Sequence, residues 1–256
     1  MKNNIAVQLY TLREECKSNF PKVLREISQM GYDGVQFAGF HDYDPLELKA
    51  VISETGLGVA GMHYSYKFLA ENTAQAIEEA KLFGTPDLVC SSMIQELRST
   101  EGYIAAKEEL NAIAKRIKPK GMRLSYHNHA YEFDTSIDGR DALSYLLEPA
   151  EENDILAEID VYWVKRGGRD VTSFLKPYVG RMPIIHLKDM SDDAEKSFAP
   201  VGTGTIDFTS ILQWGEASGV EWYVVEQDVC KSDPMECVRT SLAHLSKQFD
   251  ALKMKR

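Results

Sequence analysis

The feature that most restricts the fold is a repeat of short apolar segments, each followed by an amphipathic stretch. Eight such segments can be counted along the 256 residues. Strands that alternate with helical stretches are typical of βα units that build a parallel sheet. The eight segments are Ile5–Tyr10, Gly34–Phe37, Gly58–His63, Leu88–Ser91, Met122–His127, Ile155–Asp160, Pro183–Lys188 and Trp222–Gln227.

The repeat continues without a linker or a low-complexity stretch at which two domains could divide. About 250 residues is a usual length for one α/β barrel. We therefore predict that residues 1–256 form a single (β/α)8 TIM barrel, an α/β fold. The alternative is a doubly wound open sheet, but no Gly-x-Gly-x-x-Gly follows the first segment to bind a dinucleotide. In the first helical stretch, Ser18 is suited as the N-cap, Pro21 to the first turn and Gly31 to the end.

Composition argues against several classes of function. The chain has 39 acidic and 29 basic residues, a net charge of −10, which disfavours nucleic acid as a partner. It has no apolar run of about 18 residues and no apolar segment near its start, so we expect no membrane association and no export. The four cysteines are scattered, without the spacing of a structural zinc site. We expect a cytoplasmic protein, with homo-oligomer formation left open.

Polar side chains close the last four apolar segments, at the point where each predicted strand ends. In an α/β barrel the active site lies at the C-terminal ends of the strands. Any one of these side chains could instead cap a helix or satisfy a backbone group, but four in succession predict one divalent metal site. The residues are His127, Asn128 and His129 with Glu132 beyond them, then Asp160, His186 and Glu226.

Carboxylate and imidazole ligands without cysteine suit Mn²⁺, Mg²⁺, Co²⁺ or Zn²⁺. Three or four protein ligands would leave positions for two neighbouring oxygens of a sugar. The ion would stabilise the charge that forms when a proton leaves the carbon beside a carbonyl. We therefore predict isomerisation or epimerisation of a small-molecule sugar. Dehydration or β-elimination of a keto-sugar, a lyase reaction, is the alternative and begins with the same step.

Six motifs are spread over nearly the whole chain: Val7–Arg13, Tyr126–His129 with Glu132-Phe133, Glu158–Asp160 with Trp163, His186–Asp189, Val201–Gly204 with Ile206-Asp207, and Glu226–Asp228. Together they resemble the xylose isomerase-like TIM-barrel superfamily of sugar isomerases and epimerases, also called sugar phosphate isomerases/epimerases. What this resemblance implies is a metal held by a carboxylate near the fifth strand, by Asp160, His186 and Glu226, with two carboxylates that also transfer a proton.

The chain departs from this pattern at the fifth strand, where many relatives end on glutamate and this sequence has His127. We take Glu132 as the fourth ligand, because a second carboxylate would keep the acid/base pair, with His127 as the alternative. Glu132, Glu226 and His129 are then the catalytic candidates.

Candidate substrate contacts are weaker, because each has an equally simple structural explanation. His63 closes the third segment, and Gln36 stands in the second, where many relatives carry glutamate. Trp163 offers a ring face to a sugar, and Lys188 follows His186.

The glycine-rich run Val201–Thr205 precedes a helical stretch, so its N–H groups could hold an anion. It lacks the lysine of a P-loop, and we interpret it as a tight loop over the site. The acidic balance likewise favours a neutral keto-sugar over a phosphorylated one.

Two functions of other classes compete. Endonuclease IV repair enzymes share this superfamily's barrel, but they use several metal ions, more histidines than the six here and a positive surface. A non-catalytic sugar-binding barrel would have lost the metal, which metal analysis would reveal.

Overall fold

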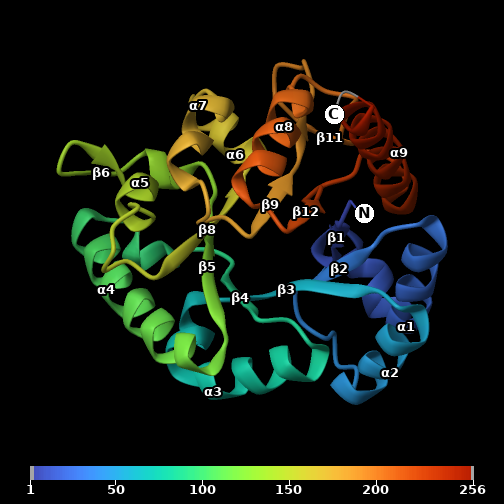
Figure 1. The fold of residues 1–256 in the computed structure, drawn as a ribbon, viewed down its shortest axis with the longest axis horizontal. Coiled ribbons are helices and arrows are strands. Elements are labelled where there is room, and N and C mark those ends of the chain that lie inside the picture. The colour runs from blue at the N-terminus through green and yellow to red at the C-terminus, as the bar shows by residue number, and fades with distance from the viewer. Residues whose placement is uncertain (1–2, 255–256) are drawn as a thin grey trace.

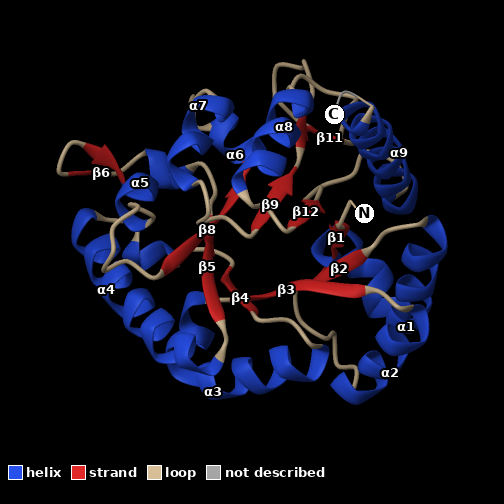
Figure 2. Ribbon diagram, in the orientation of Figure 1, coloured by secondary structure: helices blue, strands red, loops and turns tan. Residues whose placement is uncertain are grey.

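The computed structural model describes residues 3–254, and its centre is a closed barrel of eight parallel strands ringed by helices (Figures 1 and 2). Each predicted segment overlaps one strand, with ends that agree within two residues. The prediction of a (β/α)8 barrel is confirmed. In chain order, which is also their order around the barrel, the strands are β1 (Ile5–Gln8), β2 (Gly34–Phe37), β3 (Gly58–Tyr64), β4 (Asp87–Cys90), β5 (Arg123–His127), β8 (Ile155–Asp160), β9 (Ile184–Leu187) and β12 (Trp222–Val225).

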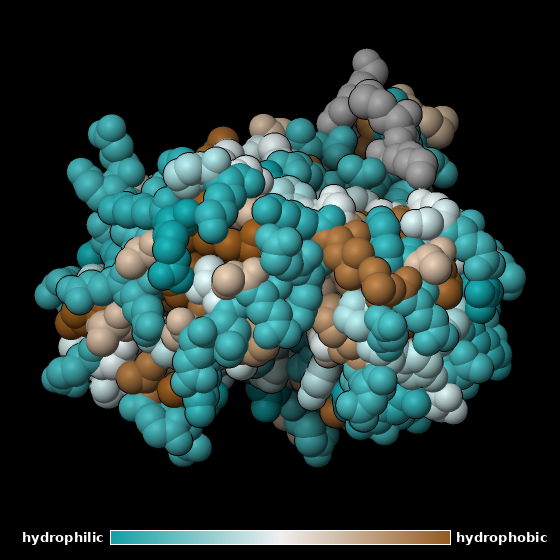
Figure 3. Space-filling model, turned by 90° about the horizontal axis from the view of Figure 1, so that it is seen from below, coloured by the Kyte–Doolittle hydropathy of each residue, from teal (hydrophilic) through white to brown (hydrophobic). Residues whose placement is uncertain are grey.

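Helices cover the outside of the barrel, and two short antiparallel hairpins lie in the connections after β5 and β9. Among residues 3–254, no helix combines the length and the apolar character needed to cross a membrane. Seen from the side of α2 and α3, the surface is mostly hydrophilic, with separate apolar areas (Figure 3). The helices are α1 (Arg13–Met30), α2 (Pro45–Thr55), α3 (Tyr66–Phe83), α4 (Thr100–Ile117), α5 (Ala142–Leu146), α6 (Val161–Arg166), α7 (Val171–Leu175), α8 (Phe208–Ser218) and α9 (Pro234–Lys253), and the hairpins are β6 (Ser136–Ile137) with β7 (Arg140–Asp141) and β10 (Asp189–Met190) with β11 (Phe198–Ala199).

Helix α1 corrects the prediction that Ser18 begins the first helix. The helix starts at Arg13 and is interrupted at Asn19, whose φ is −160° and ψ 83°. Asn19 Oδ1 accepts a hydrogen bond of 3.0 Å from the N–H of Lys22, so Asn19 caps the second half. Pro21 explains the interruption, because it lacks an N–H and its ring clashes with the preceding turn. Gly31 ends the helix at φ 102°, as predicted.

The interior of the barrel changes from apolar to polar along the strands. Ala6, Ala60, Val89, Ile184 and Val224 form a small apolar cluster inside it, separate from the main core between strands and helices. Side chains on one face of a strand recur every second residue. The next inward positions, two residues further on, are the buried Gln8, His186 and Glu226. Above this apolar cluster, the strands therefore carry polar groups inward near their C-terminal ends.

The opposite end of the barrel interior is closed by an ion cluster that joins the buried Asp87 to the partly exposed Arg123 and the exposed Glu221. Arg123 donates to both oxygens of Asp87, at 2.8 and 2.7 Å, and to both oxygens of Glu221, at 2.5 and 2.8 Å. The ring of Trp222 lies where a Cβ on Gly34 or Gly58 would be, within 2.8 Å of the first and 2.7 Å of the second. These two positions require glycine because the indole occupies the space.

Candidate metal centre and active site

Strand register brings the predicted polar residues together at the C-terminal rim. His127 in β5 pairs with Glu158 in β8, and Asp160 in β8 pairs with His186 in β9. Glu226 follows β12, the next strand around the barrel. His127, Asp160, His186 and Glu226 are all buried and each offers a ligand atom within 4.8 Å of the others. This arrangement is a candidate metal centre.

Glu158 lies one layer deeper and contacts three imidazoles. Its Oε1 is 2.6 Å from His63 Nε2, 3.1 Å from His127 Nδ1 and 3.0 Å from His186 Nε2. Its Oε2 accepts a hydrogen bond of 2.7 Å from Gln36. His63, His127, Glu158 and His186 form a second group that could hold an ion, and it shares two histidines with the rim group.

Lys188 provides a fixed positive charge beside the rim carboxylates. Its Nζ lies 3.0 Å from Asp160 Oδ2, 2.9 Å from Glu226 Oε2 and 2.7 Å from Asp228 Oδ1. Asp160 Oδ2 is buried and, despite this ion-pair contact, has no hydrogen bond of good geometry. Together with the mixed nitrogen and oxygen donors, this unsatisfied oxygen fits a divalent cation.

The electrostatic environment favours an ionised Glu226 and a neutral His127, whereas burial raises the pKa of Asp160 to about 6. Burial lowers the pKa of His127 well below its usual value, with His186 adding to the effect. Burial raises the pKa of Glu226, but Lys188 and His186 outweigh it and hold that pKa well below the usual value. Burial also opposes the charge on His186, yet Glu158 and Glu226 raise its pKa to about 10. A cation that takes the Nδ1 position of His186 must therefore displace a proton.

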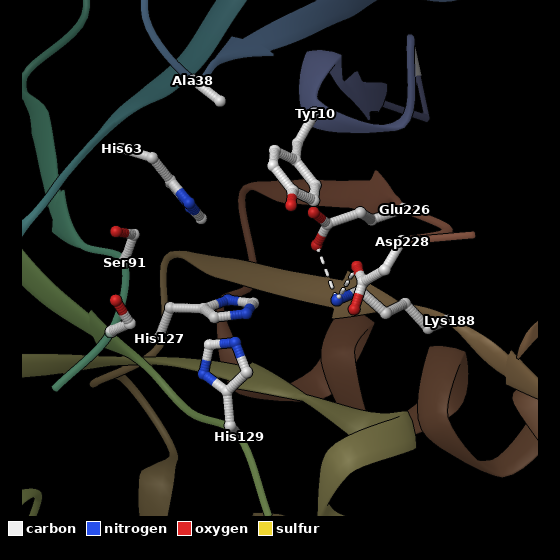
Figure 4. A pocket seen from close by; sticks show the side chains of 10 residues that line it. Tyr10, Ala38, His63, Ser91, His127, His129, Lys188, Glu226 and Asp228 are labelled. Atoms are coloured by element: carbon white, nitrogen blue, oxygen red, sulfur yellow. Dashed lines mark ion pairs between the residues drawn. The ribbon is translucent and has the colours of Figure 1, made fainter. Parts of the chain in front are cut away.

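A cavity of about 400 Å³ opens onto this centre. His63, His127 and His129 lie on one side of it, while Tyr10, Glu226, Asp228 and Lys188 lie on the other (Figure 4). Burial lowers the pKa of His129 to about 3, with Lys188 contributing, so its imidazole is neutral near pH 7. The cavity therefore has carboxylates on one wall and imidazoles on the other.

Glu132, predicted as the fourth ligand, lies outside both ligand groups. Tyr126 Oη donates to its Oε1 at 2.8 Å, and the N–H of His129 donates to its Oε2 at 2.9 Å. Both oxygens are thus engaged away from the rim, and the geometry favours His127, the alternative. Glu132 instead braces the loop that carries His129 into the cavity.

Two of the four predicted substrate contacts line the main cavity, and the other two lie elsewhere. His63 and Lys188 line the main cavity. Gln36 is fully buried beneath it, with its amide bonded to Glu158 and its carbonyl oxygen 2.6 Å from His186 Nε2. Trp163 lines a second cavity of about 290 Å³ beside Phe198.

The glycine-rich loop holds an anion that belongs to the chain itself. The N–H groups of Gly202 and Gly204 donate to Asp189 Oδ2 at 2.9 and 2.8 Å, while those of Met190 and Ile206 donate to Oδ1 at 2.8 and 3.1 Å. A Cβ on Gly204 would lie 2.5 Å from Asp189 Oδ1, which explains the glycine. The carboxylate of Asp189 therefore fills the place where the loop could have held a phosphate.

Sequence reasoning gave no separate role to Glu158, Asp228 or Tyr10. All three lie within the motifs given above. For Glu158 and Asp228 the spacing was the available signal: Glu158 precedes Asp160, and Asp228 follows Glu226, by two residues. In a strand such spacing places side chains on the same face. Tyr10 ends the first predicted segment, which was its available signal, and it reaches the cavity from the 3₁₀ turn Leu9–Leu12 after β1.

The chain is similar to known proteins over most of its length. The family model described as xylose isomerase-like TIM barrel matches residues 24–248. An inosose dehydratase of Clostridium perfringens is 25% identical, with 86% of each chain covered. A sugar phosphate isomerase/epimerase structure from Parabacteroides distasonis is 19% identical with a TM-score of 0.79, covering 96% of this chain and 94% of that one. An L-ribulose 3-epimerase structure is 15% identical with a TM-score of 0.73, covering 98% and 96%.

Proposed function

The chain belongs to the xylose isomerase-like TIM barrel family, and we propose that it is an enzyme that uses one divalent metal ion to remove a proton from the carbon beside a carbonyl of a sugar or related keto-polyol. The observation that carries this proposal is the convergence of His127, Asp160, His186 and Glu226 beside a polar cavity, which His127 and Glu226 line from opposite sides. This set departs from our first expectation by using His127 in place of Glu132. We further propose that residues 1–256 act as one domain.

The residues on the two walls have different roles in the proposal. When bound, the ion supplies positive charge where the carbonyl oxygen becomes negative. Glu226 is ionised and faces the cavity, so it accepts the proton. Lys188 holds Glu226 and Asp228 in position. His129, neutral and on the opposite wall, faces the other side of a bound substrate.

Isomerisation or epimerisation is the first candidate outcome, in which the proton returns to a neighbouring carbon or to the other face of the same carbon. Dehydration is the second, and the curated relatives named inosose dehydratase favour it. In that reaction Glu226 takes the proton from carbon and returns it to the hydroxyl on the next carbon, which leaves as water.

We also propose a neutral substrate. Asp189 fills the glycine-rich loop, so those N–H groups are occupied. The cavity wall near Lys188 carries Glu226 and Asp228, which repel a phosphate. The charge of the one lysine is already shared among three carboxylates.

The experiment that tests the proposal uses metal-loaded protein in deuterated water with free ketoses, keto-inositols, keto-glycosides and sugar phosphates. NMR would read the exchange of substrate hydrogen for deuterium, and ultraviolet absorption would detect a conjugated product of dehydration. We expect exchange with a neutral substrate. Exchange confined to sugar phosphates would contradict the neutral-substrate proposal, while exchange with none of the panel would favour a binding protein.

A further inference from the structure

Glu158 contacts three imidazoles as well as the amide of Gln36, although fewer partners would satisfy a buried carboxylate. We propose that Glu158 is the positioning residue of the metal centre: it holds His127 and His186 in the tautomers that turn one nitrogen of each ring to the rim, and so makes the site prefer Co²⁺ or Zn²⁺ over Mg²⁺. This inference rests on the metal centre proposed above.

Both imidazoles are placed between Glu158 and a rim carboxylate. His127 directs Nδ1 to Glu158 at 3.1 Å, and its Nε2 lies 3.8 Å from Asp160 Oδ2. His186 directs Nε2 to Glu158 at 3.0 Å, and its Nδ1 lies 2.9 Å from Glu226 Oε2. The nitrogens available to an ion at the rim are therefore Nε2 of His127 and Nδ1 of His186.

The hydrogen bonds around Gln36 determine where the protons sit. Gln8 donates from its amide to Gln36 Oε1 at 2.8 Å, and Gln36 donates from its own amide to Glu158 Oε2 at 2.7 Å. Gln36 Oε1 therefore accepts, and His186 Nε2, at 2.6 Å from it, must carry hydrogen. An ionised Glu158 can only accept, so His127 Nδ1 must carry hydrogen as well. Both lone pairs that remain face the rim.

This arrangement has a consequence for the choice of metal. A carboxylate that accepts the second N–H of a ligand histidine fixes the ring and strengthens its donor nitrogen. Two imidazole nitrogens among four ligands favour ions such as Zn²⁺ and Co²⁺, whereas Mg²⁺ prefers oxygen ligands. At the end of β5, where a carboxylate was expected, the chain has the imidazole of His127. The carboxylate of Glu158 lies beside it, at the paired position of β8.

The first test measures metal affinity in a matched pair of variants, Glu158→Gln and Glu132→Gln. Both remove a buried carboxylate charge, but only Glu158 contacts the ligand histidines. Metal-free protein would be titrated with Co²⁺ and followed by its visible absorption, with circular dichroism to establish folding. We expect Glu158→Gln to weaken Co²⁺ binding by about 10–100-fold and Glu132→Gln to leave it close to the parent. Millimolar Mg²⁺ should not displace Co²⁺ from the parent.

Equal Co²⁺ affinity in Glu158→Gln and the parent would overturn the role of Glu158, and ready displacement by Mg²⁺ would overturn the selectivity. A parent that binds no Co²⁺ or Zn²⁺ at all would instead overturn the metal centre itself, and this inference with it.

The second test needs no variant and so does not depend on Glu158→Gln folding. Imidazole nitrogen NMR of the Zn²⁺-loaded parent would identify the tautomer of each of the six histidines. We expect hydrogen on Nδ1 of His127 and on Nε2 of His186. The opposite pattern would place the ion in the deeper group with His63 and Glu158, and would overturn the proposal.

Discussion

The two ends of the barrel interior both hold buried charges, and they differ in how those charges are neutralised. At the N-terminal end, Arg123 forms bidentate ion pairs with both Asp87 and Glu221. At the C-terminal end, Lys188 contacts three carboxylates and His186 contacts one of them, yet one oxygen of Asp160 has no hydrogen bond of good geometry. Active sites of this fold lie at the C-terminal end, and the other end serves stability. The ends therefore differ in hydrogen bonding: every oxygen of Asp87 and Glu221 accepts a bond, whereas the rim keeps a buried carboxylate oxygen where a cation could bind.

The largest expected effect comes from removing a buried aspartate at each end. Asp160→Ala should abolish stoichiometric metal binding and substrate hydrogen exchange, because it deletes a ligand and leaves the barrel core intact. Asp87→Ala should keep both properties and lose stability, because Arg123 loses its more buried partner. Metal analysis after dialysis, together with urea unfolding, would measure both effects. Retention of a full equivalent of metal by Asp160→Ala would contradict the rim site.

The next effect compares the glutamates that flank β12, Glu226→Gln and Glu221→Gln. The amide keeps the shape of Glu226 but cannot take a proton, so exchange in deuterated water should fall by about 10²–10⁴-fold. Glu221→Gln changes a carboxylate at the far end of the same strand and should leave exchange unchanged. Comparable rates for Glu226→Gln and the parent would exclude Glu226 as the base.

A third comparison removes the cation at each end, with Arg123→Met and Lys188→Met. Each substitution leaves at least one buried carboxylate, Asp87 or Asp160, without its cation and should cost about 3–5 kcal/mol of unfolding free energy. Metal at a concentration 100 times the dissociation constant stabilises any variant that keeps the rim site by about 2.7 kcal/mol, so Arg123→Met should gain as much as the parent. Lys188→Met should gain more at the same metal concentration, because the unpaired rim carboxylates bind the cation more tightly. Unfolding in urea with and without Zn²⁺ would measure this. Equal restoration in both variants would remove the distinction between the two ends.

The smallest expected effect concerns Glu132, which belongs to neither end. Burial raises its pKa to about 7 from 4.5, despite the hydrogen bond from Tyr126. Between those two values the folded protein binds the proton more tightly than the unfolded chain, so stability is present at low pH and falls as pH rises towards 7. Glu132→Gln should abolish this pH-dependent fall in unfolding free energy, which is of the order of 2 kcal/mol between pH 5 and pH 7.5. The measurement is the difference in unfolding free energy between variant and parent at pH 5 and pH 7.5.

The fold and the rim were predictable because both depend on local periodicity. Once a barrel is assumed, His127, Asp160, His186 and Glu226 are predicted to share its rim, because each lies at or near the end of its segment. Glu132 was misplaced because its distance along the chain says nothing about the direction of its side chain. Tyr126 and the backbone of His129 turn it away from the rim. Contacts between strands, such as that of Gln36 with Glu158, depend on register around a closed barrel and leave no local pattern.

The loop that encloses Asp189 has a consequence for which ligands a variant of this chain could bind. Four N–H groups already converge on one carboxylate. Replacing Asp189 by alanine would leave them pointing at a vacant spot one residue from Lys188 along the chain. Formate or acetate added to that variant would occupy the vacancy and restore the ordered loop. The loop thus carries its own anion, and one substitution, Asp189→Ala, would make its four N–H groups available to an external carboxylate.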